Sequence, residues 1–143
     1  MTAAVDSPRD TLLDPMPRRK LGRMPWEASL LTLGGVKWDS FIPEPDAIAL
    51  IHRAIELGIN TFDTAAVYGN GKSETRLGLA LVGHRKNLWI NTKTPKRDYD
   101  GAKKDLDTSL ERLKTDYIDM LYLHRIENDD DYAKAIDKGG VLK

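Results

Sequence analysis

The fold is decided by residues 59–74, which read Ile-Asn-Thr-Phe-Asp-Thr-Ala-Ala-Val-Tyr-Gly-Asn-Gly-Lys-Ser-Glu. The first part, residues 59–63, has the composition of a short strand and ends on a carboxylate, Asp63. A loop with Tyr68 and two glycines follows, and Ser73 offers a capping hydroxyl to an expected helix. The stretch therefore predicts a strand, a loop and a helix, with a carboxylate and a phenol close together at the strand end.

Helices and strands alternate on both sides of this stretch. Residues 1–17 show no periodicity and are expected to form a flexible N-terminal arm before a single domain at 18–143. Apolar spacing, with glycine and proline at the breaks, predicts the elements. A hairpin is expected within 18–33, and its last part, 29–33, is the first core strand. Further strands are expected at 59–63, 88–92 and 117–124, and helices at 43–58, 73–83, 100–113 and 129–137.

This alternation predicts an α/β fold with a parallel sheet and right-handed crossovers, either a small open sheet or an arc of a barrel. The glycines after the first core strand, Gly34 and Gly35, lead into Val-Lys-Trp-Asp. They do not form the glycine-rich fingerprint of a Rossmann domain. The chain has 143 residues, whereas a complete eight-stranded α/β barrel has about 250.

The composition argues against several classes of function. There are 22 basic and 22 acidic side chains, so the net charge favours neither nucleic acid nor a membrane surface as a partner. Without cysteine there can be no disulfide, thiolate metal site or thiol nucleophile. The apolar runs are shorter than a membrane span, and the first residues lack the apolar stretch of a signal peptide. These observations predict a soluble, cytoplasmic protein.

Ionisable residues stand at the ends of three predicted strands: Asp63, Lys93 and His124. Parallel strands lie about 4.8 Å apart and end at one edge, so these side chains are expected to converge below Tyr68. Asp63 and Lys93 are expected to form an ion pair. The Lys93 ammonium favours the charged form of the phenol, and His124 is suited to hydrogen-bond a substrate carbonyl. Such a site polarises a carbonyl and transfers a proton, and it requires a hydride donor.

The same residues belong to a longer series of motifs within about 18–143. The motifs are Asn60-Thr-Phe-Asp-Thr-Ala, Tyr68-Gly-Asn-Gly-Lys-Ser-Glu, Thr92-Lys93, Ser109-Leu-Glu-Arg-Leu-Lys-Thr-Asp-Tyr-Ile-Asp and Leu123-His124. Their order resembles the first half of the aldo-keto reductase family. The resemblance implies four βα units of a TIM-type (β/α)8 barrel, a half-barrel, preceded by a hairpin that closes the bottom of the barrel.

The resemblance also implies roles for individual residues. Asp63, Tyr68, Lys93 and His124 correspond to the catalytic tetrad of the family, with tyrosine as the general acid and NADPH as the hydride donor. Gly35 and Asp63 are the residues expected near the cofactor. Most of the NADP-binding residues of the family belong to its second half.

Two other interpretations of the sequence carry less weight. Residues 66–73 fit a relaxed phosphate-binding loop, but Asp63 and Tyr68 intervene where such a loop directly follows a buried apolar strand. Lys72 is then a first-turn helix residue. No metal site is expected, because His52 and His84 lack metal-ligand spacing and the aspartates at 129–131 lack the pattern of a calcium loop.

The sequence thus leads to two hypotheses about function. The first is an NADP(H)-dependent reductase of small-molecule aldehydes and ketones. The alternative is a catalytically inactive, truncated half-barrel that self-associates or pairs with a missing C-terminal half. The first and last strands of a four-stranded sheet each have an unpaired edge, so a homo-oligomer or a complementing half-barrel is the expected partner.

Overall fold

The computed structural model describes residues 16–38 and 41–142. The predicted N-terminal arm at 1–17 therefore falls almost entirely outside the described residues. The elements are β1 (Arg18–Lys20), β2 (Glu27–Ser29), β3 (Leu33–Gly34), α1 (Glu44–Glu56), β4 (Thr61–Asp63), a 3-10 turn η1 (Tyr68–Gly71), α2 (Lys72–Ala80), η2 (Arg85–Asn87), β5 (Trp89–Thr94), α3 (Tyr99–Leu113), β6 (Met120–Leu123) and α4 (Asp129–Ile136).

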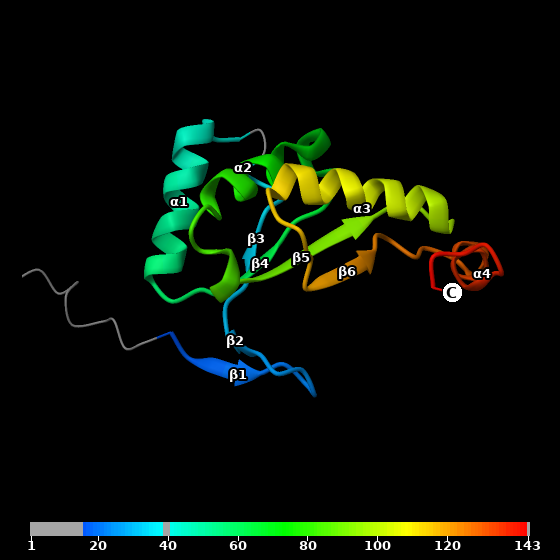
Figure 1. The fold of residues 1–143 in the computed structure, drawn as a ribbon, viewed down its shortest axis with the longest axis horizontal. Coiled ribbons are helices and arrows are strands. Elements are labelled where there is room, and N and C mark those ends of the chain that lie inside the picture. Colours follow the sequence, from blue (N-terminus) through cyan, green and yellow to red (C-terminus); the bar gives the residue numbers. More distant parts are fainter. Residues whose placement is uncertain (1–15, 39–40, 143) are drawn as a thin grey trace, which may run out of the picture.

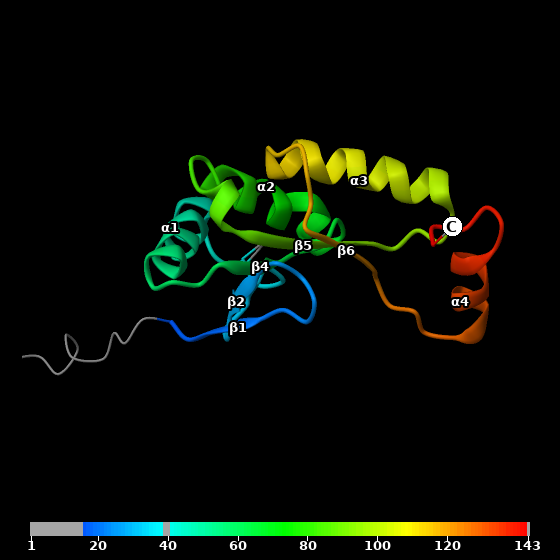
Figure 2. The same ribbon diagram turned by 60° about the horizontal axis from the view of Figure 1, so that its bottom comes forward.

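The sheet confirms the predicted α/β architecture. Its four strands run parallel in the order β3-β4-β5-β6, so α1, α2 and α3 each cross from one strand to its neighbour. Strands β1 and β2 form a separate antiparallel hairpin. Figure 2 shows α2 and α3 on one side of the sheet and the hairpin on the other, with α1 beside α2 at the left, while α4 lies beyond the ends of β5 and β6 (Figure 1).

The alternation of side chains along the strands creates two faces with different chemistry. Phe62 and Ile90 are fully buried and pack against the helices, where Ile51, Leu77 and Leu113 complete the core. On the strands the intervening positions point the other way. That second face carries the polar strand-end residues. The helices therefore bury the apolar face of the sheet, and the polar side chains lie on the opposite face.

Two predicted boundaries are wrong at the N-terminal side of the sheet. The first core strand was expected at 29–33, but the core strand is Leu33–Gly34 and Ser29 still belongs to the hairpin, where it pairs with Arg18. The backbone N–H of Ser29 donates to the side-chain oxygen of Asn60 (2.7 Å). This bond ties the hairpin to the segment before β4.

The predicted capping role of Ser73 is also wrong. Helix α2 begins at Lys72, and its N-cap is Gly71, whose φ of 89° is a left-handed conformation that favours glycine. Ser73 is fully buried, and its hydroxyl donates to the carbonyl of Gly35 (2.9 Å) and accepts from the indole of Trp38 (2.6 Å). It therefore joins the helix to the loop after β3.

The remaining elements lie where they were predicted, but their ends differ by up to three residues, as for the strand expected at 117–124, which is Met120–Leu123. Strand β5 continues to Thr94, so Lys93 lies inside the strand and not just after it. Helix α4 begins after Asn128, whose side-chain oxygen accepts from the backbone N–H of Asp131 (2.8 Å). Across the described residues, no helix combines the length and apolarity that a membrane crossing requires.

Candidate active site

An ion pair between β4 and β5 forms the base of the site. Asp63 is the last residue of β4 and lies opposite Asn91 of β5, so Lys93 stands two residues further along the neighbouring strand. The Lys93 ammonium donates to the Asp63 carboxylate and to the carbonyl of Thr64 (2.7 Å). The predicted ion pair is confirmed. The side chains of Lys93 and Asp63 are only 15% and 28% exposed, so solvent screens the pair less than a surface pair.

Tyr68 lies directly over this pair. It begins the turn η1, in which Gly69 and Asn70 both have positive φ. The Lys93 ammonium is 4.9 Å from the centre of the Tyr68 ring. Tyr68 in turn meets the His124 ring edge-on, with ring centres 5.7 Å apart and planes at 82°. The structure thus brings together all four candidate catalytic residues.

His124 follows β6 by one residue and is bonded to the end of β5 through its backbone N–H, which donates to the carbonyl of Thr94 (2.9 Å). Burial, together with the nearby cations Lys93, Arg125 and Arg97, lowers the pKa of the imidazole below its ordinary value of 6.5, and Asp63 opposes this shift in part. The ring is therefore neutral at pH 7. A neutral imidazole has one N–H to donate and one nitrogen to accept.

Tyr68 and His124 open onto a cleft of about 660 Å³. A cleft of this size accommodates a small molecule beside the two polar groups. Its lining consists of Val36, Val67, Tyr68, Pro95, His124 and Arg125. The walls are mostly apolar, so a ligand there is partly withdrawn from water and held against a phenol and an imidazole.

Gly35, the other residue predicted near a cofactor, has a packing role in this structure. Its backbone N–H donates to the carbonyl of Asp63 (2.7 Å), and a side chain at this position would come within 2.8 Å of the Trp38 ring. The glycine therefore lets the loop after β3 close onto α2 beside Asp63.

A buried carboxylate behind the Tyr68 turn was missed at the sequence level. Glu74 is fully buried in α2, where it accepts from the hydroxyl of Thr92 (2.6 Å) and pairs with Arg112 of α3 (3.2 Å). The Arg112 guanidinium also reaches the carbonyl of Ala66 (3.4 Å), in the loop that leads to Tyr68. Nothing in the local pattern distinguishes Glu74 from an exposed first-turn acid, because its partners come from distant segments.

The two other interpretations of the sequence involved Lys72 and the histidines His52 and His84. Lys72 is the first residue of α2, as predicted. His52 approaches the carbonyl of Ala80 (3.1 Å), and its ring lies 6.0 Å from that of His84. Within 16–38 and 41–142 there is no cluster of three or more His, Cys, Asp or Glu placed to hold a metal ion.

Comparisons with known proteins agree with the geometry. The model of the aldo/keto reductase family matches residues 30–138. The uncharacterized oxidoreductase YqkF of Bacillus subtilis is 34% identical over 140 aligned residues, which cover 90% of this chain and 45% of that protein.

Solved structures give the same result. An aldo-keto reductase of Bacillus halodurans in its holo form superimposes with a TM-score of 0.71 at 32% identity, over 81% of this chain and 43% of its own. An aldo/keto reductase of Klebsiella pneumoniae, described in complex with NADP and acetate, aligns with a TM-score of 0.64 at 27% identity, over 68% of this chain and 35% of its own.

The chain spans less than half the length of each of these relatives. Its four parallel strands and their helices correspond to part of their TIM-type barrel, which confirms the predicted half-barrel fold. With a family model that matches most of its length and a fold shared with solved members, the chain belongs to the aldo/keto reductase family.

Proposed function

We propose that this chain carries the proton-transfer site of an NADP(H)-dependent aldo-keto reductase that reduces aldehydes and ketones to alcohols. One observation carries the proposal: Lys93 lies between the Asp63 carboxylate and the Tyr68 ring, and His124 meets the same ring from the other strand. A phenol beside an ammonium, with an imidazole at its edge, is suited to deliver a proton to a carbonyl oxygen.

Each residue has a separate role in this proposal. The N–H of the neutral His124 ring donates to the substrate carbonyl oxygen and orients it toward Tyr68. The Tyr68 hydroxyl then gives its proton to that oxygen as a hydride reaches the carbonyl carbon. Lys93 stabilises the phenolate that remains, and Asp63 holds Lys93 in place and keeps it charged. Proton uptake from solvent restores the phenol.

The residues present fit the reacting end of a nicotinamide nucleotide. The cleft beside Tyr68 has apolar walls from Val36 and Val67, and the Asp63 carboxylate lies at the adjacent strand end. Bound NADPH supplies the hydride, and the Klebsiella pneumoniae relative described with NADP supports this choice of cofactor. We propose Gly35 and Asp63 as the cofactor-contacting residues of this chain.

The test has two stages. NADPH binding is measured first by fluorescence titration, and consumption of NADPH is then followed by absorbance with a panel of simple aldehydes and ketones. We expect saturable binding and turnover that is lost in Tyr68→Phe. Tyr99→Phe is the matched control, because Tyr99 is exposed at the start of α3 and lies outside the cleft. Absence of turnover with every carbonyl, or equal turnover in the two variants, would overturn the proposal.

A second candidate function rests on the edges of the sheet. Strands β3 and β6 each have one strand neighbour in the described part of the chain, and Leu121 and Tyr122 of the edge strand β6 are exposed. Such an edge pairs readily with another chain. In this candidate the half-barrel associates with a second copy or a complementing half without catalysing. Sedimentation of the purified chain is expected to show a dimer or larger, and a single 16.1 kDa species would contradict association.

A further inference from the structure

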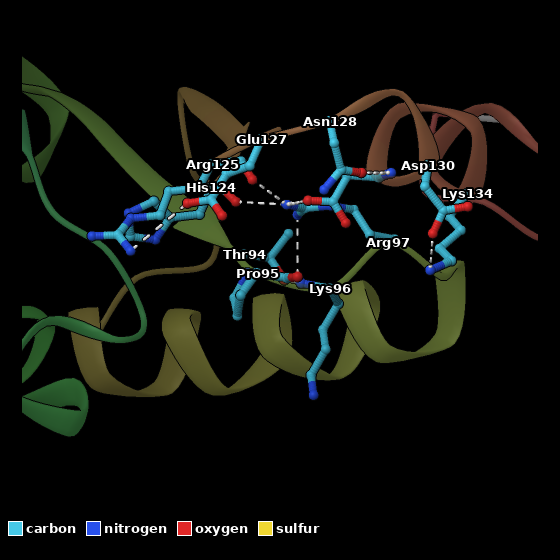
Figure 3. A network of polar contacts seen from close by, with 11 residues as sticks. Thr94, Pro95, Lys96, Arg97, His124, Arg125, Glu127, Asn128, Asp130 and Lys134 are labelled. Atoms are coloured by element: carbon cyan, nitrogen blue, oxygen red, sulfur yellow. Dashed lines mark hydrogen bonds and ion pairs between the residues drawn. The ribbon is translucent and has the colours of Figure 1, made fainter.

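Arg97 connects the two loops that follow β5 and β6. Its guanidinium group donates through Nη2 to the backbone carbonyls of His124 (2.8 Å) and Arg125 (2.6 Å). Nη1 donates to the carbonyl of Pro95 (3.1 Å), in its own loop. Only 13% of the Arg97 side chain is exposed. Figure 3 shows this side chain pointing from its own loop into the backbone of the His124 loop.

The backbone that Arg97 holds is strained. Arg125 has a φ of 55°, a left-handed conformation that non-glycine residues rarely adopt. A turn of this kind persists only where tertiary contacts stabilise it. The two carbonyls that accept from Arg97 are those of His124 and of the strained residue itself.

His124 is therefore held from both sides of its backbone. Its N–H donates to the carbonyl of Thr94 at the end of β5, and its carbonyl accepts from Arg97. Without the second bond only the first remains, and the turn at Arg125 can relax to an ordinary conformation. That relaxation would rotate the His124 ring away from Tyr68, which it now meets edge-on at 5.7 Å.

Arg97 is itself held at two points, and the residues after it are held at a third. Its guanidinium pairs with Asp131 in the first turn of α4 (3.3 Å). Its backbone carbonyl accepts from the backbone N–H of Val141 (2.9 Å). Two residues later, the backbone N–H of Tyr99 donates to the carbonyl of Gly139 (2.9 Å). Helix α4 and the segment after it thus fix the cation that in turn fixes the His124 loop.

We propose that Arg97 is a positioning residue of the reductase site, which acts through the carbonyls of His124 and Arg125 to hold the imidazole against Tyr68. This inference rests on the proposed function. It adds a residue outside the tetrad whose side chain touches neither Tyr68 nor the imidazole. Lysine cannot replace it fully, because the guanidinium serves the Pro95 carbonyl through Nη1 and the His124 and Arg125 carbonyls through Nη2, whereas lysine has a single nitrogen.

Arg85 provides a matched control at the opposite end of the strands. Its side chain is also 13% exposed, pairs with Asp119 (2.7 Å), and donates to the carbonyls of Leu88 (2.7 Å) and Tyr117 (3.0 Å). Both arginines therefore join two loops through carbonyls and a carboxylate. Only Arg97 lies at the end of the sheet that carries the site, so a purely structural role predicts equal effects of the two substitutions.

The experiment compares Arg97→Met, Arg97→Lys and Arg85→Met by two readouts. The first is NMR of the three histidine rings, assigned with His124→Gln, which needs no cofactor and no activity. In the unmodified protein we expect the Tyr68 ring current to shift the His124 ring protons, because the two rings lie 5.7 Å apart. We expect Arg97→Met to abolish that shift and to raise the titration midpoint of His124, because one of the cations around the ring is lost. Besides Arg97, the charged groups near the His124 ring are Lys93, Asp63 and Arg125.

The second readout is turnover in the NADPH assay. We expect a fall in kcat of roughly ten- to a hundredfold in Arg97→Met, as for a catalytic group displaced by about 1 Å, with partial recovery in Arg97→Lys. Arg85→Met should leave kcat and the His124 resonance unchanged. If Arg97→Met does not fold, Asp131→Asn loosens the same guanidinium and gives smaller changes of the same sign.

The outcomes separate the two proposals. An unchanged His124 resonance in folded Arg97→Met, or equal shifts in Arg97→Met and Arg85→Met, would overturn the positioning role whether or not the chain is active. A displaced His124 resonance in a chain that never consumes NADPH would uphold the placement by Arg97 and count against the proposed function.

Discussion

Substitution of Arg112 by methionine should destabilise the protein by about 3 kcal/mol, because it leaves the Glu74 carboxylate buried without its cation. Glu74 is fully buried, whereas Arg112 is 29% exposed and 3.2 Å away. Loss of the partner of a buried charge costs about 3–5 kcal/mol, and the partial exposure of Arg112 puts this site at the lower end. For a chain of this size the loss corresponds to a fall in Tm of about 10 °C.

The carboxylate itself can be neutralised without changing its shape. Glu74→Gln keeps an oxygen for the Thr92 hydroxyl and loses the charged bond to Arg112, at a cost of about 1–2 kcal/mol. In the double variant no charge is buried. The sum of the destabilisations of the two single variants should therefore exceed the destabilisation of the double variant by at least about 1 kcal/mol.

Urea unfolding followed by circular dichroism measures all three variants. Lys103→Met serves as the control, because Lys103 pairs with Asp107 on the exposed face of α3 and its loss should leave the unfolding midpoint unchanged. A cost for Arg112→Met below about 1 kcal/mol, or strict additivity of the single variants, would refute the importance of this buried pair.

Three further predictions concern single residues. Gly35→Ala should lower the free energy of unfolding, measured in urea, by about 1–3 kcal/mol, because its new methyl group meets the Trp38 ring at 2.8 Å. Gly34→Ala, where the space is open, should leave the free energy of unfolding unchanged, and equal losses in the two variants would contradict the packing role of Gly35. Asn128→Ala should lower the free energy of unfolding by about 1 kcal/mol, because α4 loses its N-cap. Asn128→Asp keeps a capping oxygen and should leave the free energy of unfolding unchanged, so a loss of stability in both variants would exclude capping as the cause. The free energy of unfolding should fall as the pH drops below 6.5, because His124 in the unfolded chain takes up a proton at a higher pH than in the folded chain. His124→Gln should flatten this dependence of the free energy of unfolding on pH, and an unchanged dependence would refute the lowered pKa of His124.

The convergence of Asp63, Lys93 and His124 could be predicted because it depends on a simple rule of parallel sheets. In a parallel sheet the carboxyl ends of neighbouring strands meet at one edge, so Asp63, Lys93 and His124 converge as soon as their strands are recognised. An error of two residues in the end of β5 did not matter, because Lys93 keeps the face that alternation assigns to it.

The supports of that site could not be predicted because they are contacts between distant segments. Glu74 meets Arg112 at a separation of 38 residues, and Arg97 meets the carbonyl of His124 at 27. Neither contact leaves a local pattern, since an acid in the first turn of a helix or an arginine in a loop is usually solvated.

The sequence by itself determined the order of the elements, the parallel sheet and the four side chains at its edge, because period and strand ends are local properties of the chain. Only the tertiary structure decided that Ser73 is buried, that Gly35 packs on Trp38, and that Arg97 and Arg112 hold the loops of His124 and Tyr68. The packing of helices against the sheet selects these partners, and that packing depends on the whole chain at once.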